Sequence, residues 1–183
     1  MSRAVRPAPR EGWRSRIRNG PTTSPRQTTP KNTVETDETC TPCDVLLVED
    51  SFDDVFFVKR AWEKNGQPYR LVHVANGDEA RAYLSAEGKY AALAGLPPPK
   101  LVVSDLKMPC WDGMQLLRWV RGHSRLGQLP FVMLSSSPRE SDIGEALSAG
   151  ASAYFVKPRT LPGFVQLLVE LQHFWNPAPT DVF

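Results

Sequence analysis

Charged and hydroxyl side chains follow directly after short apolar runs at four places in this chain. Glu49 and Asp50 come after the run VLLV, and Asp105 comes after LVVS. Ser135 follows the run FVML, and Lys157 follows AYFV. Three carboxylates, one hydroxyl and one ammonium therefore stand at the ends of apolar segments.

These residue types suit one kind of chemistry if they meet in space. Three close carboxylates repel one another, so their site is costly unless a cation is bound. A hard oxygen cluster suits Mg²⁺, which keeps several waters and often bridges to a phosphoryl group. With Mg²⁺ and a lysine to neutralise developing charge, an aspartate can be the nucleophile that accepts a phosphoryl group. The residues therefore predict phosphoryl transfer to a carboxylate.

Alternating segments would bring these side chains together. The predicted strands are 45–49, 70–75, 100–104, 130–134 and 153–156, and the predicted helices are 51–65, 77–87, 112–121, 138–150 and 161–174, with Ser51 and Asp112 as N-caps. Strict alternation predicts an α/β fold, a parallel sheet with helices on both faces. A flavodoxin-like, doubly wound sheet of order 2-1-3-4-5 and a half-Rossmann unit both fit. No G-x-G-x-x-G follows the first strand, which disfavours dinucleotide binding.

The order 2-1-3-4-5 makes the first and third strands neighbours. Ligands bind beyond the carboxyl ends of such strands, so Glu49, Asp50 and Asp105 are expected to converge on one cleft. Ser135 would face the same cleft, and Lys157 would place an ammonium on its rim.

The two ends of the chain differ in composition from the middle. Residues 1–43 contain six prolines, and residues 1–31 carry eight Arg or Lys against one acid. This segment is predicted to be a disordered basic tail, followed by one domain over 44–176 and a short tail over 177–183. No apolar run reaches the roughly 18 residues of a membrane helix, and no secretory signal is evident, so a cytoplasmic location is expected. Cys40 and Cys43 form a C-x-x-C. A redox role is disfavoured because a strand and not a helix follows, and a zinc role because no second C-x-x-C or His pair completes the site.

The stretches VLLVEDS, VVSDLKMPCWDG, VMLSSS and ASAYFVKP resemble the receiver domain of two-component response regulators, over about residues 44–175. The resemblance implies a CheY-like fold with five helices and makes Asp105 the phosphoacceptor. Asp50 would bind Mg²⁺ directly, and Glu49 partly through water. Asp105 itself and the backbone carbonyl of Lys107 would complete the metal shell.

The same resemblance assigns the remaining site residues. Ser135 would be the switch hydroxyl, Tyr154 the switch aromatic, and Lys157 the contact to the phosphoryl oxygen. The Lys157–Pro158 bond is often cis in this family. VEDSFDDVFF, AEGKYAALAGLPPP and QHFW look like stand-alone receivers that are paired with phytochrome-like or other hybrid sensor kinases.

The expected function is that of a single-domain response regulator, phosphorylated on Asp105 by a sensor histidine kinase in a Mg²⁺-dependent reaction. It would signal by protein contact, with no DNA-binding domain, and its fourth helix, fifth strand and fifth helix would form a partner or homodimer face. Such a protein is not a conventional enzyme, although it would assist its own phosphorylation and dephosphorylation. The alternative is a receiver-like interaction module that works without phosphorylation. A haloacid-dehalogenase-type phosphatase is disfavoured, because its second acid would stand where this chain has Lys107.

The sequence leaves two interpretations open for a pair of acids near the first strand and for the aromatic residues of the last helix. Asp53 and Asp54 are either first-turn acids that complement the helix dipole or additional members of the metal site. Trp175, with Phe174 and Val165, either packs in the core or forms an exposed apolar patch on the last helix.

Overall fold

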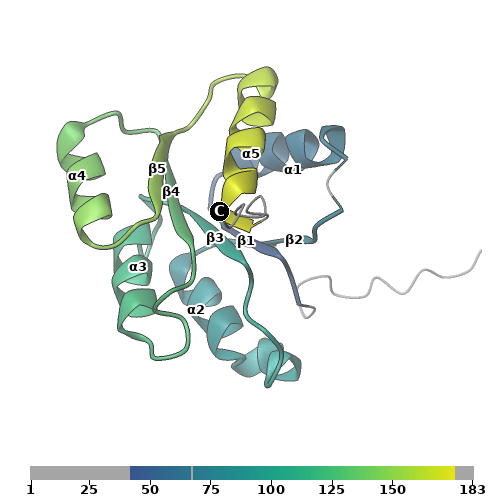
Figure 1. Ribbon diagram of the computed structural model, residues 1–183, viewed down its shortest axis with the longest axis vertical. Helices are drawn as coiled ribbons and strands as arrows, with labels where there is room; N and C mark the ends of the chain where they lie inside the picture. Colours follow the sequence, from purple (N-terminus) through teal and green to yellow (C-terminus); the bar gives the residue numbers. More distant parts are fainter. Residues whose placement is uncertain (1–41, 67, 176–183) are drawn as a thin grey trace, which may run out of the picture. The chain divides into compact units, whose positions relative to one another are not determined.

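Five short strands form one parallel sheet at the centre of the domain (Figure 1). The strands are β1 (Val45–Val48), β2 (Leu71–Val74), β3 (Leu101–Asp105), β4 (Phe131–Ser135) and β5 (Ala153–Val156). Their order in the sheet is β2-β1-β3-β4-β5, and every neighbouring pair is parallel. The predicted flavodoxin-like topology is therefore confirmed.

A computed structural model describes residues 42–66 and 68–175, which lie within a single compact unit. Apart from Pro42 and Cys43, the predicted N-terminal tail lies outside these residues, as does the tail over 177–183. The domain boundaries therefore stay predictions. In the part of the chain that is described, no helix is both long and apolar enough to cross a membrane.

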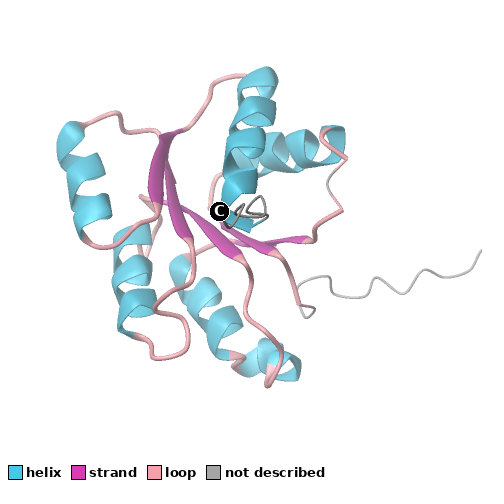
Figure 2. Ribbon diagram, viewed as in Figure 1, coloured by secondary structure: helices cyan, strands magenta, loops and turns pink. Residues whose placement is uncertain are grey.

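Helices cover both faces of the sheet, as Figure 2 shows in cyan around the magenta strands. They are α1 (Phe52–Lys64), α2 (Gly77–Ser85), α3 (Gly113–Gly122), α4 (Glu140–Ser148) and α5 (Leu161–Trp175), with a short 3₁₀ helix η2 (Gly88–Leu93) after α2. One apolar core joins α1 and α5 to the sheet, and a second joins α2, α3 and α4 to its other face. This arrangement follows from right-handed crossovers between parallel strands.

The sequence pattern of the strands follows from their position in the sheet. Every residue of β1, β3 and β4 is buried, because helices cover both faces of these central strands. β5 lies at the edge, and its residues are only partly buried or exposed. A continuous apolar run therefore marked the central strands.

The helix starts match the predicted caps. The Ser51 hydroxyl accepts a hydrogen bond from the amide of Asp54 at 3.4 Å. Asp112 and Gln115 form a capping box at the start of α3, with hydrogen bonds of 2.7 and 3.0 Å. The cap of α3 fixes the direction in which the chain leaves the end of β3.

The 3₁₀ helix η2 was not predicted. α2 ends at Ser85, and its C-cap residue Ala86 has a φ of 55°, in the left-handed region, so the chain turns sharply there. Tyr90 is buried, and its hydroxyl donates to Glu79 of α2 at 3.0 Å. This contact between η2 and α2 stabilises a turn that the local sequence pattern does not predict.

The two interpretations of Trp175 are decided in favour of packing. Its side chain is 4% exposed and its ring centroid lies 5.4 Å from that of Trp62 on α1. Phe174 and Val165 are partly buried against the same core. The alternative of an exposed patch at Trp175 is wrong, because α5 turns this side of the helix toward α1 and the sheet.

Candidate functional site

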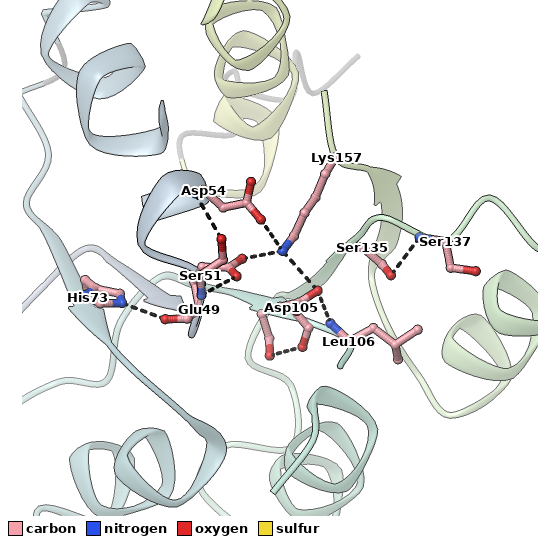
Figure 3. A network of polar contacts seen from close by, with 10 residues as sticks. Glu49, Ser51, Asp54, His73, Asp105, Leu106, Ser135, Ser137 and Lys157 are labelled. Carbon is pink, nitrogen blue, oxygen red and sulfur yellow. Dashed lines mark hydrogen bonds and ion pairs between the residues drawn. The ribbon is translucent and has the colours of Figure 1, made fainter. Parts of the chain in front are cut away.

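The carboxyl ends of the strands bring the predicted site residues together (Figure 3). Glu49 and Asp50 leave the end of β1, and Asp105 is the last residue of the neighbouring β3. Ser135 ends β4, and Lys157 directly follows β5. Residues more than a hundred positions apart thus meet because parallel strands all end at the same edge of the sheet.

An acidic cluster forms the floor of the site. Glu49, Asp50 and Asp105 each offer a carboxylate oxygen, and these atoms lie within 4.8 Å of one another. Glu49 is 1% exposed and Asp105 is 7% exposed, whereas Asp50 is open to solvent. Three hard oxygen donors with one solvent-facing side fit a divalent cation such as Mg²⁺, which keeps waters in its shell.

The Lys157 ammonium lies among three carboxylates. Its Nζ is 2.7 Å from Oε2 of Glu49, 2.8 Å from Oδ2 of Asp54 and 3.3 Å from Oδ1 of Asp105. Only 7% of the Lys157 side chain is exposed. Figure 3 shows the side chain reaching from β5 across the site to α1 and β1.

The Asp105 carboxylate is oriented by its neighbours. Its Oδ1 accepts a hydrogen bond from the amide of Leu106 at 2.8 Å, besides pairing with Lys157. None of the described residues donates a hydrogen bond to its Oδ2. Gly113 lets α3 approach closely, because a Cβ at that position would stand 2.1 Å from the Asp105 carbonyl oxygen.

Burial raises the pKa of two carboxyl groups of the site, Glu49 and Asp105. It raises the pKa of Glu49 to about 7, even though the Lys157 ammonium acts in the opposite direction. Burial also raises the pKa of Asp105, against the attraction of Lys157. Burial disfavours the charge of Lys157, yet hydrogen bonds to Asp54 and Glu49 hold its pKa above the ordinary value. A divalent cation bound among these acids would offset the cost of ionising them.

A polar cleft opens beside Asp105. It is lined by Asp105, Lys107, Ser135, Ser136, Ser137, Pro138 and Arg139. The hydroxyl of Ser135 accepts from the amide of Ser137 at 3.2 Å. Tyr154 on β5 donates from its hydroxyl to the carbonyl of Ser137 at 2.8 Å. Ser135 and Tyr154 therefore contact the same loop between β4 and α4.

Three further predictions meet the structure differently. Lys107 is exposed and lines the cleft, while its carbonyl as a metal ligand stays a prediction. The Lys157–Pro158 bond, which is often cis in this family, is not cis here, since the described residues contain no cis peptide. The thiol of Cys43 is buried, which raises its pKa to about 11 and disfavours the reactive thiolate; Cys40 lies outside the described residues.

Two residues of the site were missed or left undecided by sequence reasoning. Asp54 accepts a hydrogen bond from Lys157. Neither interpretation from the sequence, a first-turn acid or a metal ligand, included this contact. His73 on β2 places its Nε2 2.8 Å from the carbonyl oxygen of Glu49. The acid at Asp54 was visible in the sequence, but its partner lies 103 positions away.

Comparisons with known proteins agree with this geometry. Residues 45–168 match the family model described as the response regulator receiver domain. Response regulator Rcp1 of Synechocystis sp. is 29% identical over 144 residues, which cover 79% of this chain and 96% of that protein. A probable methanogenesis regulatory protein, FilR2 of Methanothrix harundinacea, is 30% identical over 144 residues, with 75% and 90% covered.

Solved structures show the same fold. The phosphorylated cyanobacterial phytochrome response regulator RcpA superposes with a TM-score of 0.65 at 31% identity, covering 74% of this chain and 94% of that chain. The Mn²⁺-bound form of Rcp1 gives a TM-score of 0.65 at 28% identity, covering 76% and 98%. Together with the acidic cluster and the sheet order β2-β1-β3-β4-β5, these matches show that the chain belongs to the response regulator receiver domain family.

Proposed function

We propose that this protein is a response regulator whose Asp105 accepts a phosphoryl group from the phosphohistidine of a sensor kinase. The observation that carries the proposal is the surroundings of Asp105: a buried carboxylate 3.3 Å from Lys157, with Glu49 and Asp50 close enough to share a cation. An ordinary surface aspartate has neither an ammonium nor two further carboxylates beside it.

The chemical step uses the free side of the Asp105 carboxylate. Oδ2 attacks the phosphorus, and the new P–O bond forms as the P–N bond of the phosphohistidine breaks. The imidazole, protonated on its other ring nitrogen, takes the bonding electron pair and leaves as a neutral ring. The Leu106 amide and Lys157 hold Oδ1, so the attacking oxygen is oriented before the donor arrives. Lys157 then donates to a phosphoryl oxygen and neutralises part of its charge.

The metal part of the proposal is Mg²⁺ held by Glu49, Asp50, Asp105 and the Lys107 carbonyl. Bound there, Mg²⁺ would supply positive charge to the phosphoryl oxygens in the transition state. Its support is the close set of carboxylate oxygens, together with the similarity of this chain to Rcp1, which has been solved in a Mn²⁺-bound form. With these groups the protein would assist its own phosphorylation and dephosphorylation.

Signal output is proposed to start at the loop between β4 and α4. A phosphoryl group on Asp105 would draw the Ser135 hydroxyl, which now accepts from Ser137. Tyr154 would follow, because its hydroxyl is bound to the carbonyl of the same Ser137. The change would reach the face formed by α4, β5 and α5. The charge added at Asp105 would thereby shift this face between two conformations.

The three elements of that face each carry an exposed apolar side chain. Leu147 on α4 is 47% exposed, Val156 on β5 is 47% exposed and Val169 on α5 is 43% exposed. We propose that a homodimer forms there in the phosphorylated state. The downstream target would be reached by protein contact.

The phosphodonor and the compartment complete the proposal. Several of the similar solved structures are phytochrome or bacteriophytochrome response regulators, which supports a phytochrome-like or hybrid sensor kinase as donor. Cys43 and Cys110 are free thiols, as expected for a protein of the reducing cytoplasm.

Intact-mass spectrometry tests the proposed chemistry. Wild-type protein and the Asp105→Asn variant are incubated with phosphoramidate, with and without Mg²⁺. We expect one phosphoryl adduct on the wild type with Mg²⁺, and none on Asp105→Asn or without the metal. An adduct of equal yield on Asp105→Asn would refute the proposal, and a folded wild type without any adduct would favour the phosphorylation-independent interaction module.

A further inference from the structure

The Lys157 ammonium has three carboxylate partners in this structure. The partners are Glu49 at 2.7 Å, Asp54 at 2.8 Å and Asp105 at 3.3 Å. A lysine ammonium has three donors and no more. Lys157 therefore has no donor left over for an arriving phosphoryl group, and one of its present contacts must be given up.

The three partners differ in what it costs to release them. Glu49 is 1% exposed, and a buried carboxylate left without its ammonium is strongly disfavoured. The Asp105 side chain is 9% exposed, and its Oδ1 stays with Lys157 while its Oδ2 takes the phosphoryl group. The Asp54 side chain is 26% exposed, so water can take over its hydrogen bonds when Lys157 leaves. Asp54 is the partner that is least costly to release.

The helix cap does not account for the position of the Asp54 carboxylate. Asp54 is the third residue of α1, and in a full capping box its side chain would bind the amide of the N-cap residue Ser51. That amide instead donates to Oε1 of Glu49 at 3.1 Å. The carboxylate of Asp54 turns to Lys157, as Figure 3 shows.

We propose that Asp54 is a positioning residue that competes with the phosphoryl group for the Lys157 ammonium. In the resting state it holds Lys157 toward α1, and on phosphorylation Lys157 moves one N–H from Asp54 to a phosphoryl oxygen. This inference rests on the proposed function of Asp105. Asp54 thus opposes phosphorylation, and its removal favours the phosphorylated state.

The chain offers a matched control for this test. Asp53 lies one position earlier in the same first turn, is exposed, and its side chain makes no hydrogen bond to Lys157 or any other described residue. Asp53→Asn and Asp54→Asn remove the same charge from the same helix end. Both variants therefore change the helix dipole interaction and the general field alike, and only Asp54→Asn releases Lys157.

The experiment measures the rate of Asp105 phosphorylation by phosphoramidate with Mg²⁺, and the lifetime of the adduct, by intact mass. We expect Asp54→Asn to raise the ratio of phosphorylation to dephosphorylation rate constants about threefold to fivefold, as loss of one partly exposed ion pair implies. Asp53→Asn should stay within about twofold of wild type, and Asp54→Glu, which keeps the carboxylate, should restore the wild-type ratio. Thermal unfolding of each variant verifies that it is folded.

Each outcome decides the question. An equal increase in Asp53→Asn and Asp54→Asn would assign the effect to charge alone and overturn the competition. A phosphorylated wild type with an unchanged or lowered ratio in Asp54→Asn would overturn this inference while leaving the function of Asp105 intact. A wild type that takes up no phosphoryl group at all would refute the proposed function, and the inference with it.

Discussion

Glu49 is a carboxylate that the fold buries against an electrostatic penalty. Its side chain is 1% exposed, and burial raises its pKa to about 7, although Lys157 lies 2.7 Å away. The ionised form that a metal requires is therefore disfavoured in the metal-free protein. Asp105 is affected in the same direction. The acids of the site thus couple cation binding to pH.

The sign of the pH dependence follows from the raised pKa. A folded-state pKa above the unfolded value means that the contribution of Glu49 to stability is full below pH 4.5 and is lost as pH rises through about 7. Without metal, we expect the Tm to fall over this range, less so in Glu49→Gln. Because protons compete with Mg²⁺, the Mg²⁺-induced rise in Tm should be at least about twofold larger at pH 8 than at pH 5.5. Equal rises at the two pH values, measured by thermal denaturation, would contradict this.

At the scale of elements, the connection from β3 to α3 depends on a close approach of two backbones. A Cβ at Gly113 would lie 2.1 Å from the Asp105 carbonyl oxygen and 2.9 Å from Sδ of Met133. The amide of Gly113 donates to the carbonyl of Leu106 at 3.0 Å, which secures the turn. The start of α3 and the position of the Asp105 carboxylate are therefore linked.

Replacing two helical glycines by alanine separates packing from helix propensity. Gly113→Ala is expected to lower the free energy of unfolding by about 1–3 kcal/mol, because the added methyl overpacks the turn. A Cβ at Gly144 in α4 would have no other atom within 4 Å. Gly144→Ala should therefore raise the free energy of unfolding by about 0.5–1 kcal/mol, because alanine favours the helix over glycine. Urea unfolding measures both. A loss of stability in Gly144→Ala, or none in Gly113→Ala, would show that the backbones are arranged differently.

At the scale of the whole molecule, an open parallel sheet has two edges, and β5 forms one of them. Its last residue, Val156, is 47% exposed and directly precedes Lys157 of the site. In the chain, α4 precedes β5 and α5 follows it. Leu147 of α4 and Val169 of α5 are exposed apolar residues. The site and the proposed dimer face are thus joined by β5, so a change at Lys157 on phosphorylation is next to the proposed dimer contact at Val156.

A charge on that edge tests the dimer. Val156→Glu is expected to weaken phosphorylation-dependent self-association by about tenfold or more, since a buried unpaired charge is strongly disfavoured at an apolar interface. Phe56→Glu on α1, where the native side chain is 56% exposed, is the control and should leave self-association unchanged. Sedimentation velocity with and without phosphoramidate measures both. Loss of the dimer in Phe56→Glu alone would move the interface to α1.

Local signals in the sequence were enough to predict the order of elements and the sheet topology. They also predicted that Glu49, Asp50, Asp105, Ser135 and Lys157 gather at one edge of the sheet. This was possible because apolar runs and cap residues are read over a few positions, and because parallel strands leave few topologies open. The roles of those five side chains remain predictions that the chemical tests above address.

The long-range partners, in contrast, are known only from the folded chain. The pairing of Asp54 with Lys157 spans 103 positions, and a first-turn acid looks the same in sequence whether or not a lysine lies above it. The packing of Trp175 on Trp62 and the contact of Tyr90 that supports η2 are of the same kind. The direction of a side chain depends on how its helix packs against the sheet, and the local sequence pattern does not determine that packing.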